Sequence, residues 1–269
     1  MTDPTDSRPT PKSSDGPIRF ETSRRMFLAA AGVTTLGVAG IGNTAGFGRN
    51  EMRSFTVRLE NVSTGTTLTT SKNGELAEQP VPLSPGAYAV HRNDEPIFTS
   101  GEPERNNGLE EVAEDGNPER LASALAERDS VAASGAFTTP MGSDEPSPLP
   151  PREAYEFEVE TPMMSNVRLS LVTMFVPSND LFFALGGASG MRLFDGNDPI
   201  SGDVSKSVSL WDAGTEINEE PGTGPNQAQR QRAPGVGLVE RGTVAPIADV
   251  NGYDYPDACD VLKLTIQPQ

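Results

Sequence analysis

The chain has 269 residues, with 38 acidic and 21 basic side chains and a formal net charge of −17 at pH 7. This charge argues against nucleic acid or anionic lipid as a partner, because both are bound through clustered basic side chains. The chain contains one cysteine and one histidine, which excludes an internal disulfide framework and leaves almost no ligands for zinc or copper.

The first fifty residues differ in composition from the rest. Ser23-Arg24-Arg25-Met26-Phe27-Leu28 precedes a Gly- and Ala-rich apolar run over residues 29–46. Paired arginines ahead of such a run indicate a twin-arginine export signal. The alternative, an uncleaved anchor helix, is disfavoured by the glycines and threonines of the run. We expect residues 1–50 to be leader and signal, residues 51–269 to be one domain without a stable membrane span, and the protein to be secreted or at the cell surface.

The acidity of residues 51–269 has a general explanation. This part carries 15 basic and 34 acidic side chains, and lysine is scarce. Such a surface keeps a protein hydrated and soluble in concentrated salt, where ordinary charge repulsion is screened. A halophilic microbial source is therefore expected, and an isolated Asp or Glu says little about function.

Short strand-like segments dominate the first half of this domain. Alternating or short apolar patterns predict strands over residues 55–63, 86–92, 96–100 and 155–161. Two helical segments interrupt them at residues 109–129, the second opened by Pro118. A Pro-rich loop over residues 142–152 follows.

The second half continues the same pattern. Residues 166–180 become continuously apolar towards their end, as expected of a strand that enters a core. Further strands are predicted at residues 181–187, 190–194, 207–211, 236–244 and 260–267, with a long polar loop over 218–235. Many short strands punctuated by Gly and Pro predict an all-β fold, an antiparallel β-sandwich with one or two short helices in an insertion.

Catalytic motifs are weak in this sequence. A Ser-His-Asp triad would have to use His91, and Gly187-Ala188-Ser189-Gly190 lacks the spacing of a nucleophile elbow. We expect His91 to be a strand residue with satisfied hydrogen bonds. A glycosidase needs two carboxylates, which any acidic chain supplies, and one Trp with four Tyr offers few sugar platforms. An enzyme is not expected.

Calcium requires hard oxygen ligands at six to eight coordination, which this chain has in quantity. Residues 195–203 begin like an EF-hand loop but lack its glycine and its final Glu, and residues 249–260 show no ligand spacing, so both are expected to be solvated loops. Asp180 ends an apolar strand, and Asp212 and Glu216 follow the strand that ends at Trp211. Carboxylates at the ends of core strands are positioned by the sheet. These three are the predicted metal ligands.

Three segments together resemble one family. "GLEEVAEDGNPERL" from Gly108, "VPSNDLFFALGG" from Val176 and "SLWDAGTEIN" from Ser209 are similar, in order and spacing, to landmarks of the spondin domain. This domain is found in F-spondin and mindin and in stand-alone secreted microbial proteins. The resemblance covers about residues 55–269 and implies an antiparallel β-sandwich that binds Ca²⁺ at the positions of Asp180, Asp212 and Glu216. The family commonly has Asp where this chain has Glu216.

The resemblance and the residues lead to one expected function. We expect a secreted, calcium-binding spondin-like domain that acts in adhesion or ligand binding at the cell surface or in extracellular matrix. Its partner would be an extracellular or cell-surface protein or glycan. The alternatives are an extracellular hydrolase of surface glycans that uses the same carboxylates, and a purely structural envelope component.

Overall fold

The computed structural model describes residues 51–72, 74–92, 94–250 and 252–269, and all of them belong to one compact unit. The predicted leader and export signal, residues 1–50, lie outside the described residues. In the part of the chain that the structure describes, no helix is long and apolar enough to cross a membrane.

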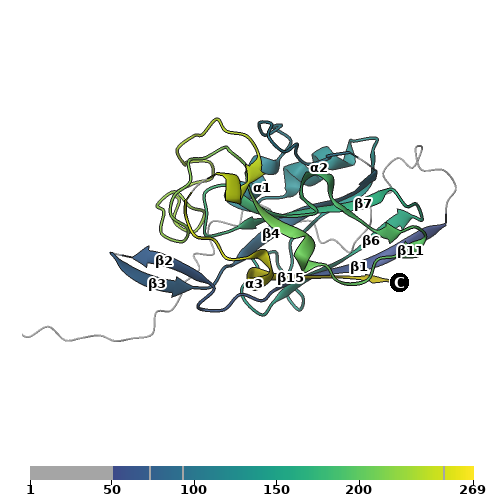
Figure 1. The fold of residues 1–269 in the computed structure, drawn as a ribbon, viewed down its shortest axis with the longest axis horizontal. Helices are drawn as coiled ribbons and strands as arrows, with labels where there is room; N and C mark the ends of the chain where they lie inside the picture. The colour runs from purple at the N-terminus through teal and green to yellow at the C-terminus, as the bar shows by residue number, and fades with distance from the viewer. Residues whose placement is uncertain (1–50, 73, 93, 251) are drawn as a thin grey trace, which may run out of the picture. The chain divides into compact units, whose positions relative to one another are not determined.

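Two antiparallel sheets form the molecule's main layers, which confirms the predicted β-sandwich (Figure 1). The smaller sheet has the strand order β12-β15-β1-β6, and the larger has the order β14-β13-β8-β7-β4-β5, with β9 beside β7. The smaller sheet consists of β1 (Met52–Asn61), β6 (Ala154–Pro162), β12 (Gly202–Asp203) and β15 (Leu262–Pro268). The larger sheet consists of β4 (Leu83–Arg92), β5 (Val131–Phe137), β7 (Val167–Phe175), β8 (Leu181–Leu185), β9 (Met191–Arg192), β13 (Val208–Asp212) and β14 (Ala245–Pro246).

The main hydrophobic core lies between the two sheets. Phe55, Val57 and Leu59 alternate along β1 and are fully buried, as the period of two in the sequence predicts for a strand with one buried face. Leu171 of β7 and Phe183 of β8 belong to the same apolar cluster from the larger sheet. Burial of these side chains is the principal favourable contribution to folding.

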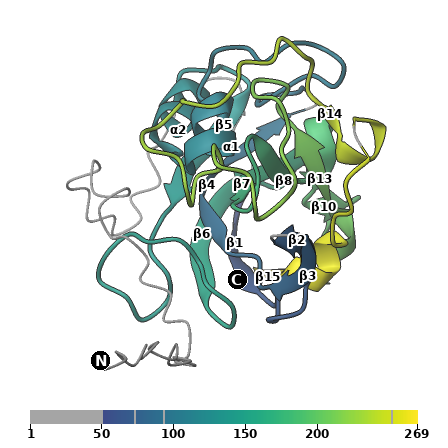
Figure 2. The ribbon, with the colours of Figure 1, turned by 90° about the vertical axis from the view of Figure 1, so that its left-hand side faces the viewer.

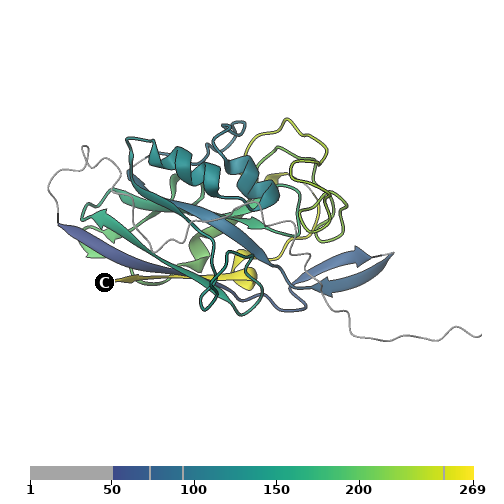
Figure 3. The ribbon, with the colours of Figure 1, turned by 180° about the vertical axis from the view of Figure 1, so that it is seen from behind.

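A second apolar cluster lies on the opposite face of the larger sheet. Helices α1 (Leu109–Asp115) and α2 (Glu119–Ala126) cover this face, as the view from behind shows (Figure 3). Ala87 and Ala89 of β4 and Val172 of β7 supply small or branched side chains beneath the helices. The larger sheet is therefore buried on both faces, which explains why residues 166–180 read as a continuous apolar run.

The remaining elements are small or lie outside the two sheets. Short strands β10 (Phe194–Asp195) and β11 (Asp198–Pro199) form one hairpin, and β2 (Leu68–Lys72) and β3 (Glu75–Gln79) form another, which projects from the sandwich (Figure 1). Three 3₁₀ turns, η2 (Gly187–Ser189), η3 (Ser205–Ser207) and η4 (Ile247–Asp249), and the short helix α3 (Ala258–Val261) complete the described elements.

Two strand predictions are wrong, and six of the described strands were not predicted. Residues 96–100 form bends and turns, and residues 236–244 form a loop with a single isolated bridge at Val239. The longer unpredicted strands are β2, β3 and β5, which are polar or rich in Ala, Ser and Gly, and the others are the two-residue strands β11, β12 and β14. Aliphatic content alone predicts a strand poorly, because a strand also needs a neighbouring strand to bond.

Candidate functional site

Two clusters of buried polar residues lie towards opposite ends of β7. Arg168, near the start of β7, pairs in register with His91 at the end of β4. Asp180 follows the other end of β7, in the turn to β8, where Leu181 pairs with Asp212 of β13. The carboxylate cluster, defined as Asp180, Asp212, Glu216 and Glu114, contains the three predicted metal ligands.

Asp180 is fully buried and links two loops. Its Oδ2 accepts hydrogen bonds from the backbone N–H groups of Thr215 (2.8 Å) and Glu216 (3.0 Å) and from the Thr215 hydroxyl (3.2 Å). The hydroxyl of Ser178 closes the β7–β8 turn, donating to the Phe175 carbonyl at 2.5 Å and accepting from the Leu181 N–H at 3.1 Å. The turn therefore holds the Asp180 carboxylate against the segment after β13.

Asp212 is the last residue of β13 and is 1% exposed. Its Oδ1 accepts from the N–H of Gly214 at 2.6 Å, a local side-chain turn typical of Asp, and its Oδ2 accepts from the Asn218 amide. Gly214 has φ +69°, and a Cβ there would lie 2.7 Å from the nitrogen of Thr243. A glycine is thus required for the close turn that separates Asp212 from Glu216.

Glu216 is 3% exposed and forms an isolated bridge with Val239. Its Oε1 accepts from the N–H of Gly237 at 2.7 Å. A Cβ at Gly237 would lie within 2.2 Å of both carboxylate oxygens, so the loop passes the Glu216 side chain only because this residue is glycine.

Glu114 was not predicted as a site residue. It lies on α1, is 4% exposed, and carries charge interactions with Glu216 and Asp180. The sequence gives no reason to single it out, because most acids of this domain are expected on a hydrated surface. Its burial depends on the loop after β13, which reaches α1 through a hydrogen bond of 2.7 Å from the Gln231 amide to Asp115. No local pattern signals such a contact between distant segments.

Burial raises the pKa of every member of the carboxylate cluster. The pKa of Asp180 is raised to about 7, mainly by burial and then by the charge of Asp212, against the hydrogen bonds from Glu216 and Thr215. Burial, with the charges of Glu216, Glu110 and Asp180, raises the pKa of Glu114 to about 8. Burial also raises the pKa values of Asp212 and Glu216. Each shift means that the site disfavours the ionised carboxylate.

Two oxygens of the carboxylate cluster lack partners. Asp180 Oδ1 and Glu216 Oε2 are buried and have no partner in good hydrogen-bonding geometry, although the Asn179 side chain lies near enough to Glu216 to lower its pKa. The ion pairs formed within the described ranges involve none of the four acids. A buried carboxylate oxygen without a donor is costly, and either a proton or a cation would relieve that cost.

These oxygens are the test of whether the residues fit a hard cation. Asp180 and Glu216 each offer a free oxygen, whereas both oxygens of Asp212 already accept hydrogen bonds. Among the described residues, no three His, Cys, Asp or Glu side chains are grouped as in a ready-made metal centre. Asp180 and Glu216 are thus the two predicted ligands with an oxygen left for a cation, and the roles of Asp180, Asp212 and Glu216 as ligands stay predictions.

The other cluster is built around His91. His91 is fully buried, its Nδ1 lies 2.8 Å from Asp94 Oδ1, and its Nε2 lies 2.9 Å from Ser170 Oγ. Both ring nitrogens are thus satisfied, as expected for a strand histidine. Asp94 Oδ2 also accepts from the Ser130 hydroxyl and, at 3.3 Å, from Arg128.

The order Ser170, His91, Asp94 is that of a catalytic triad, but its serine is inaccessible. Ser170 is 1% exposed, and a Cβ at Gly190 would lie 2.5 Å from its Oγ. The backbone of Gly190 therefore covers the hydroxyl. Ser189, the residue that the sequence motif contained, is not in this network. The network connects β4, β7 and the segment after β4, which is a stabilising role.

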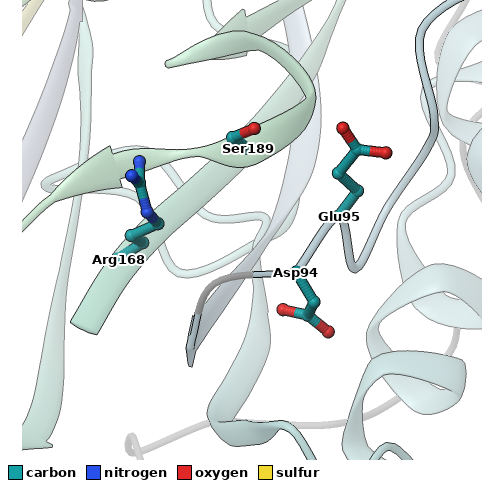
Figure 4. A pocket seen from close by; sticks show the side chains of 4 residues that line it. All are labelled: Asp94, Glu95, Arg168 and Ser189. Atoms are coloured by element: carbon teal, nitrogen blue, oxygen red, sulfur yellow. The ribbon is translucent and has the colours of Figure 1, made fainter. Parts of the chain in front are cut away.

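A pocket of about 470 Å³ adjoins this network and is lined by Asp94, Glu95, Arg168 and Ser189 (Figure 4). Figure 4 shows the Glu95 side chain directed towards the segment that carries Ser189, with the Asp94 carboxylate turned away from it. Arg168 Nη1 donates to the carbonyl of Gly190 at 2.8 Å. The pocket therefore presents charged groups of both signs but does not expose the Ser170 hydroxyl.

The two other acidic segments considered for calcium differ from the carboxylate cluster. Asp195 and Asp198 are exposed in the β10–β11 hairpin, and Asp249 and Asp260 are exposed near η4 and α3. Their exposure agrees with the expectation of solvated loops.

Comparison with known proteins finds no protein-family model that matches the chain and no curated protein that matches it. The resemblance to the spondin domain therefore stays a prediction that rests on the three quoted segments.

Proposed function

We propose that the protein is a secreted, calcium-binding β-sandwich that acts in adhesion or ligand binding at the cell surface or in extracellular matrix. The observation that carries the calcium proposal is the pair of buried oxygens without partners, Asp180 Oδ1 and Glu216 Oε2. Four buried carboxylates without a neighbouring basic side chain in an ion pair form a site that a cation would neutralise.

Asp180 and Glu216 would hold the cation, and the charges of Asp212 and Glu114 would favour its entry. Calcium suits this site better than a transition metal, because the available ligands are carboxylate and carbonyl oxygens and calcium tolerates irregular geometry. When bound, it supplies a positive charge that joins the β7–β8 turn to the loop after β13. Preferential binding to the folded state stabilises it by mass action.

Thermal unfolding of the full chain, with calcium and with a chelator, tests the proposal. Calcium at about a hundred times its Kd would raise the free energy of unfolding by about 2.7 kcal/mol and Tm by about 5–10 °C. Asp180→Asn and Glu216→Gln remove one negative charge each and are expected to abolish the rise. Asp195→Asn, a change at an exposed acid, should keep it.

The absence of any calcium-dependent rise in the unaltered chain would contradict calcium binding. A rise that persists in both Asp180→Asn and Glu216→Gln would place the ion elsewhere. For the adhesion part, calcium-dependent binding to envelope material is expected to be lost in Asp180→Asn and kept in Asp195→Asn.

A further inference from the structure

The pocket beside the His91 network contains two opposite charges that do not pair with each other. It has a volume of about 470 Å³ and is lined by Asp94, Glu95, Arg168 and Ser189. No ion pair within the described ranges includes Glu95 or Arg168. In Figure 4 the Glu95 carboxylate and the Arg168 guanidinium lie on either side of Ser189. The pocket therefore offers an anionic and a cationic group that do not neutralise each other.

The two acids of the pocket differ in what their carboxylates contact. Asp94 uses both oxygens inside the protein, since Oδ1 lies 2.8 Å from His91 Nδ1 and Oδ2 accepts from Arg128 at 3.3 Å. The Glu95 carboxylate makes no hydrogen bond to any of the described residues. Glu95 is therefore the acid that remains for a ligand.

Arg168 likewise keeps hydrogen-bond donors in reserve. Its Nη1 donates to the carbonyl of Gly190 at 2.8 Å, whereas its Nη2 and Nε have no partner in the part of the chain that the structure describes. A guanidinium is charged at every physiological pH and can bind a carboxylate through two parallel N–H groups. Arg168 therefore has the donors that a ligand carboxylate requires.

Contacts behind the pocket fix its walls. The carbonyl of Glu95 accepts from Arg105 Nη1 at 2.6 Å, which holds the backbone of one wall. Gly190 has φ +70°, and a Cβ there would lie 2.8 Å from His91 Nε2, so the opposite wall packs directly on the buried histidine. Walls that are fixed before binding reduce the entropic cost of holding a ligand. The His91 network thus supports the pocket as well as the fold.

We propose that this pocket binds a small zwitterion, a molecule with one carboxylate and one protonated amine, such as a free amino acid or a dipeptide. Arg168 pairs with the ligand carboxylate, Glu95 pairs with the ammonium group, and the Ser189 hydroxyl lies between them as a further donor or acceptor. A ligand with a single charge would leave Glu95 or Arg168 unmatched. A sugar fits less well, because none of the four lining side chains is aromatic. The volume is within the range of small-molecule sites.

The pocket is separate from the carboxylate cluster. Arg168 lies near the start of β7, whereas Asp180 follows the other end of this strand. The loop between β13 and β14 gathers at the end of the molecule that faces the viewer in Figure 2, and no residue of this loop lines the pocket. The inference therefore does not rest on the proposed calcium site, and it names a ligand class that the proposed function leaves open.

Titration of the full chain with diglycine and with L-alanine, followed by ligand-observed NMR at pH 7 and constant salt, tests the inference. Acetate and methylamine are the comparison ligands, because each carries only one of the two charges. The unaltered chain is expected to bind at least one zwitterion about tenfold more tightly than acetate or methylamine.

Substitutions at the two charged walls locate the binding site. Glu95→Gln removes the charge but nearly preserves the shape, and it should weaken zwitterion binding by about tenfold or more. Glu102→Gln, a change at an exposed acid outside the pocket, is the matched control and should bind normally. Arg168→Gln should weaken binding similarly, and Arg168→Lys, which keeps the charge, should restore part of it. Thermal unfolding verifies that each variant is folded, and Glu95→Gln carries the test if Arg168→Gln is not.

Three results would overturn the inference. The first is that neither zwitterion binds the unaltered chain at up to about 10 mM. The second is that Glu95→Gln leaves zwitterion binding unchanged or that Glu102→Gln weakens it equally. The third is that acetate binds as tightly as the zwitterions, because the pocket would then recognise an anion alone. Zwitterion binding in chelator without any calcium-dependent rise in Tm would support the pocket and reject the calcium site, and the reverse result would do the opposite.

Discussion

Acids towards the two ends of β7, half-buried Asp94 at one and buried Asp180 and Glu114 at the other, lie in opposite electrostatic settings. Asp94 accepts hydrogen bonds from Ser130 and Arg128 and contacts His91; burial raises its pKa, but these partners outweigh burial and lower the pKa to about 2. Asp180 and Glu114 lie in the carboxylate cluster, with pKa values raised to about 7 and about 8.

The direction of the pKa shift distinguishes an acid that stabilises the fold, such as Asp94, from the acids of a candidate binding site, such as Asp180 and Glu114. An acid with a cationic or hydrogen-bonding partner stabilises the fold by itself. A group of buried acids with like-charged neighbours destabilises the fold unless protons or a cation are bound. The composition of the sequence cannot make this distinction, because it depends on what surrounds each carboxylate.

The largest expected effect is on the pH dependence of stability without metal. Between about pH 4, where unfolded carboxylates titrate, and pH 7–8, folded Asp180 and Glu114 retain protons that the unfolded chain has lost. Raising the pH through this window therefore favours unfolding. We expect the free energy of unfolding in chelator to fall by on the order of 3 kcal/mol from pH 5 to pH 8. Denaturant unfolding measures it, and a flat or rising profile would contradict the raised pKa values.

Asp94→Asn is expected to destabilise the protein by about 2 kcal/mol at pH 7, because His91 and Arg128 lose their carboxylate partner. The lowered pKa of Asp94 means that its contribution is present above about pH 4 and is lost as the pH falls to about 2. The difference between variant and unaltered chain should shrink over that range. Asp129→Asn, a change at a nearby exposed acid, is the control and should be neutral. Equal stability of both variants at pH 7 would contradict a stabilising role of Asp94.

The same chemical change at the other end of β7 should have the opposite sign. Asp180→Asn keeps an oxygen for the N–H groups of Thr215 and Glu216 and removes one buried like charge. We expect it to stabilise the chain by about 1 kcal/mol in chelator at pH 8, measured by urea unfolding. A loss of stability similar to that of Asp94→Asn would show that the two ends do not differ.

Much of the fold could be predicted from the sequence, because alternating strands reveal their buried faces. The pattern at residues 55–63 and the apolar run at 166–180 correspond to β1 and β7. Strand β5, with the sequence VAASGAF, has small residues that fit beneath α2, so its strand signal is weak. Residues 236–244 have the opposite property: they contain four aliphatic side chains but form a loop, in which Val236, Leu238 and Val239 are exposed and only Val244 is buried.

The candidate site could be predicted only in part, for a physical reason. Asp212 is the last residue of β13, next to the strand end predicted at Trp211. Asp180 was predicted to end the preceding strand, but β7 stops at Phe175 and Asp180 lies directly before β8. Glu114 becomes a member only when a loop more than a hundred positions later covers α1. The contact of His91 with Ser170 spans 79 positions and likewise leaves no local pattern.

Calorimetric titration of the full chain with calcium tests the central claim, that the carboxylate cluster exchanges protons for a cation. Comparing buffers of different ionisation enthalpy at pH 7 gives the number of protons released. We predict release of about one proton per calcium, because Asp180 and Glu114 are partly protonated at this pH. Much less release is expected at pH 9. In Asp180→Asn, the protons that Asp180 contributes should no longer be released. No calcium binding, or binding without proton release at pH 7, would contradict the account.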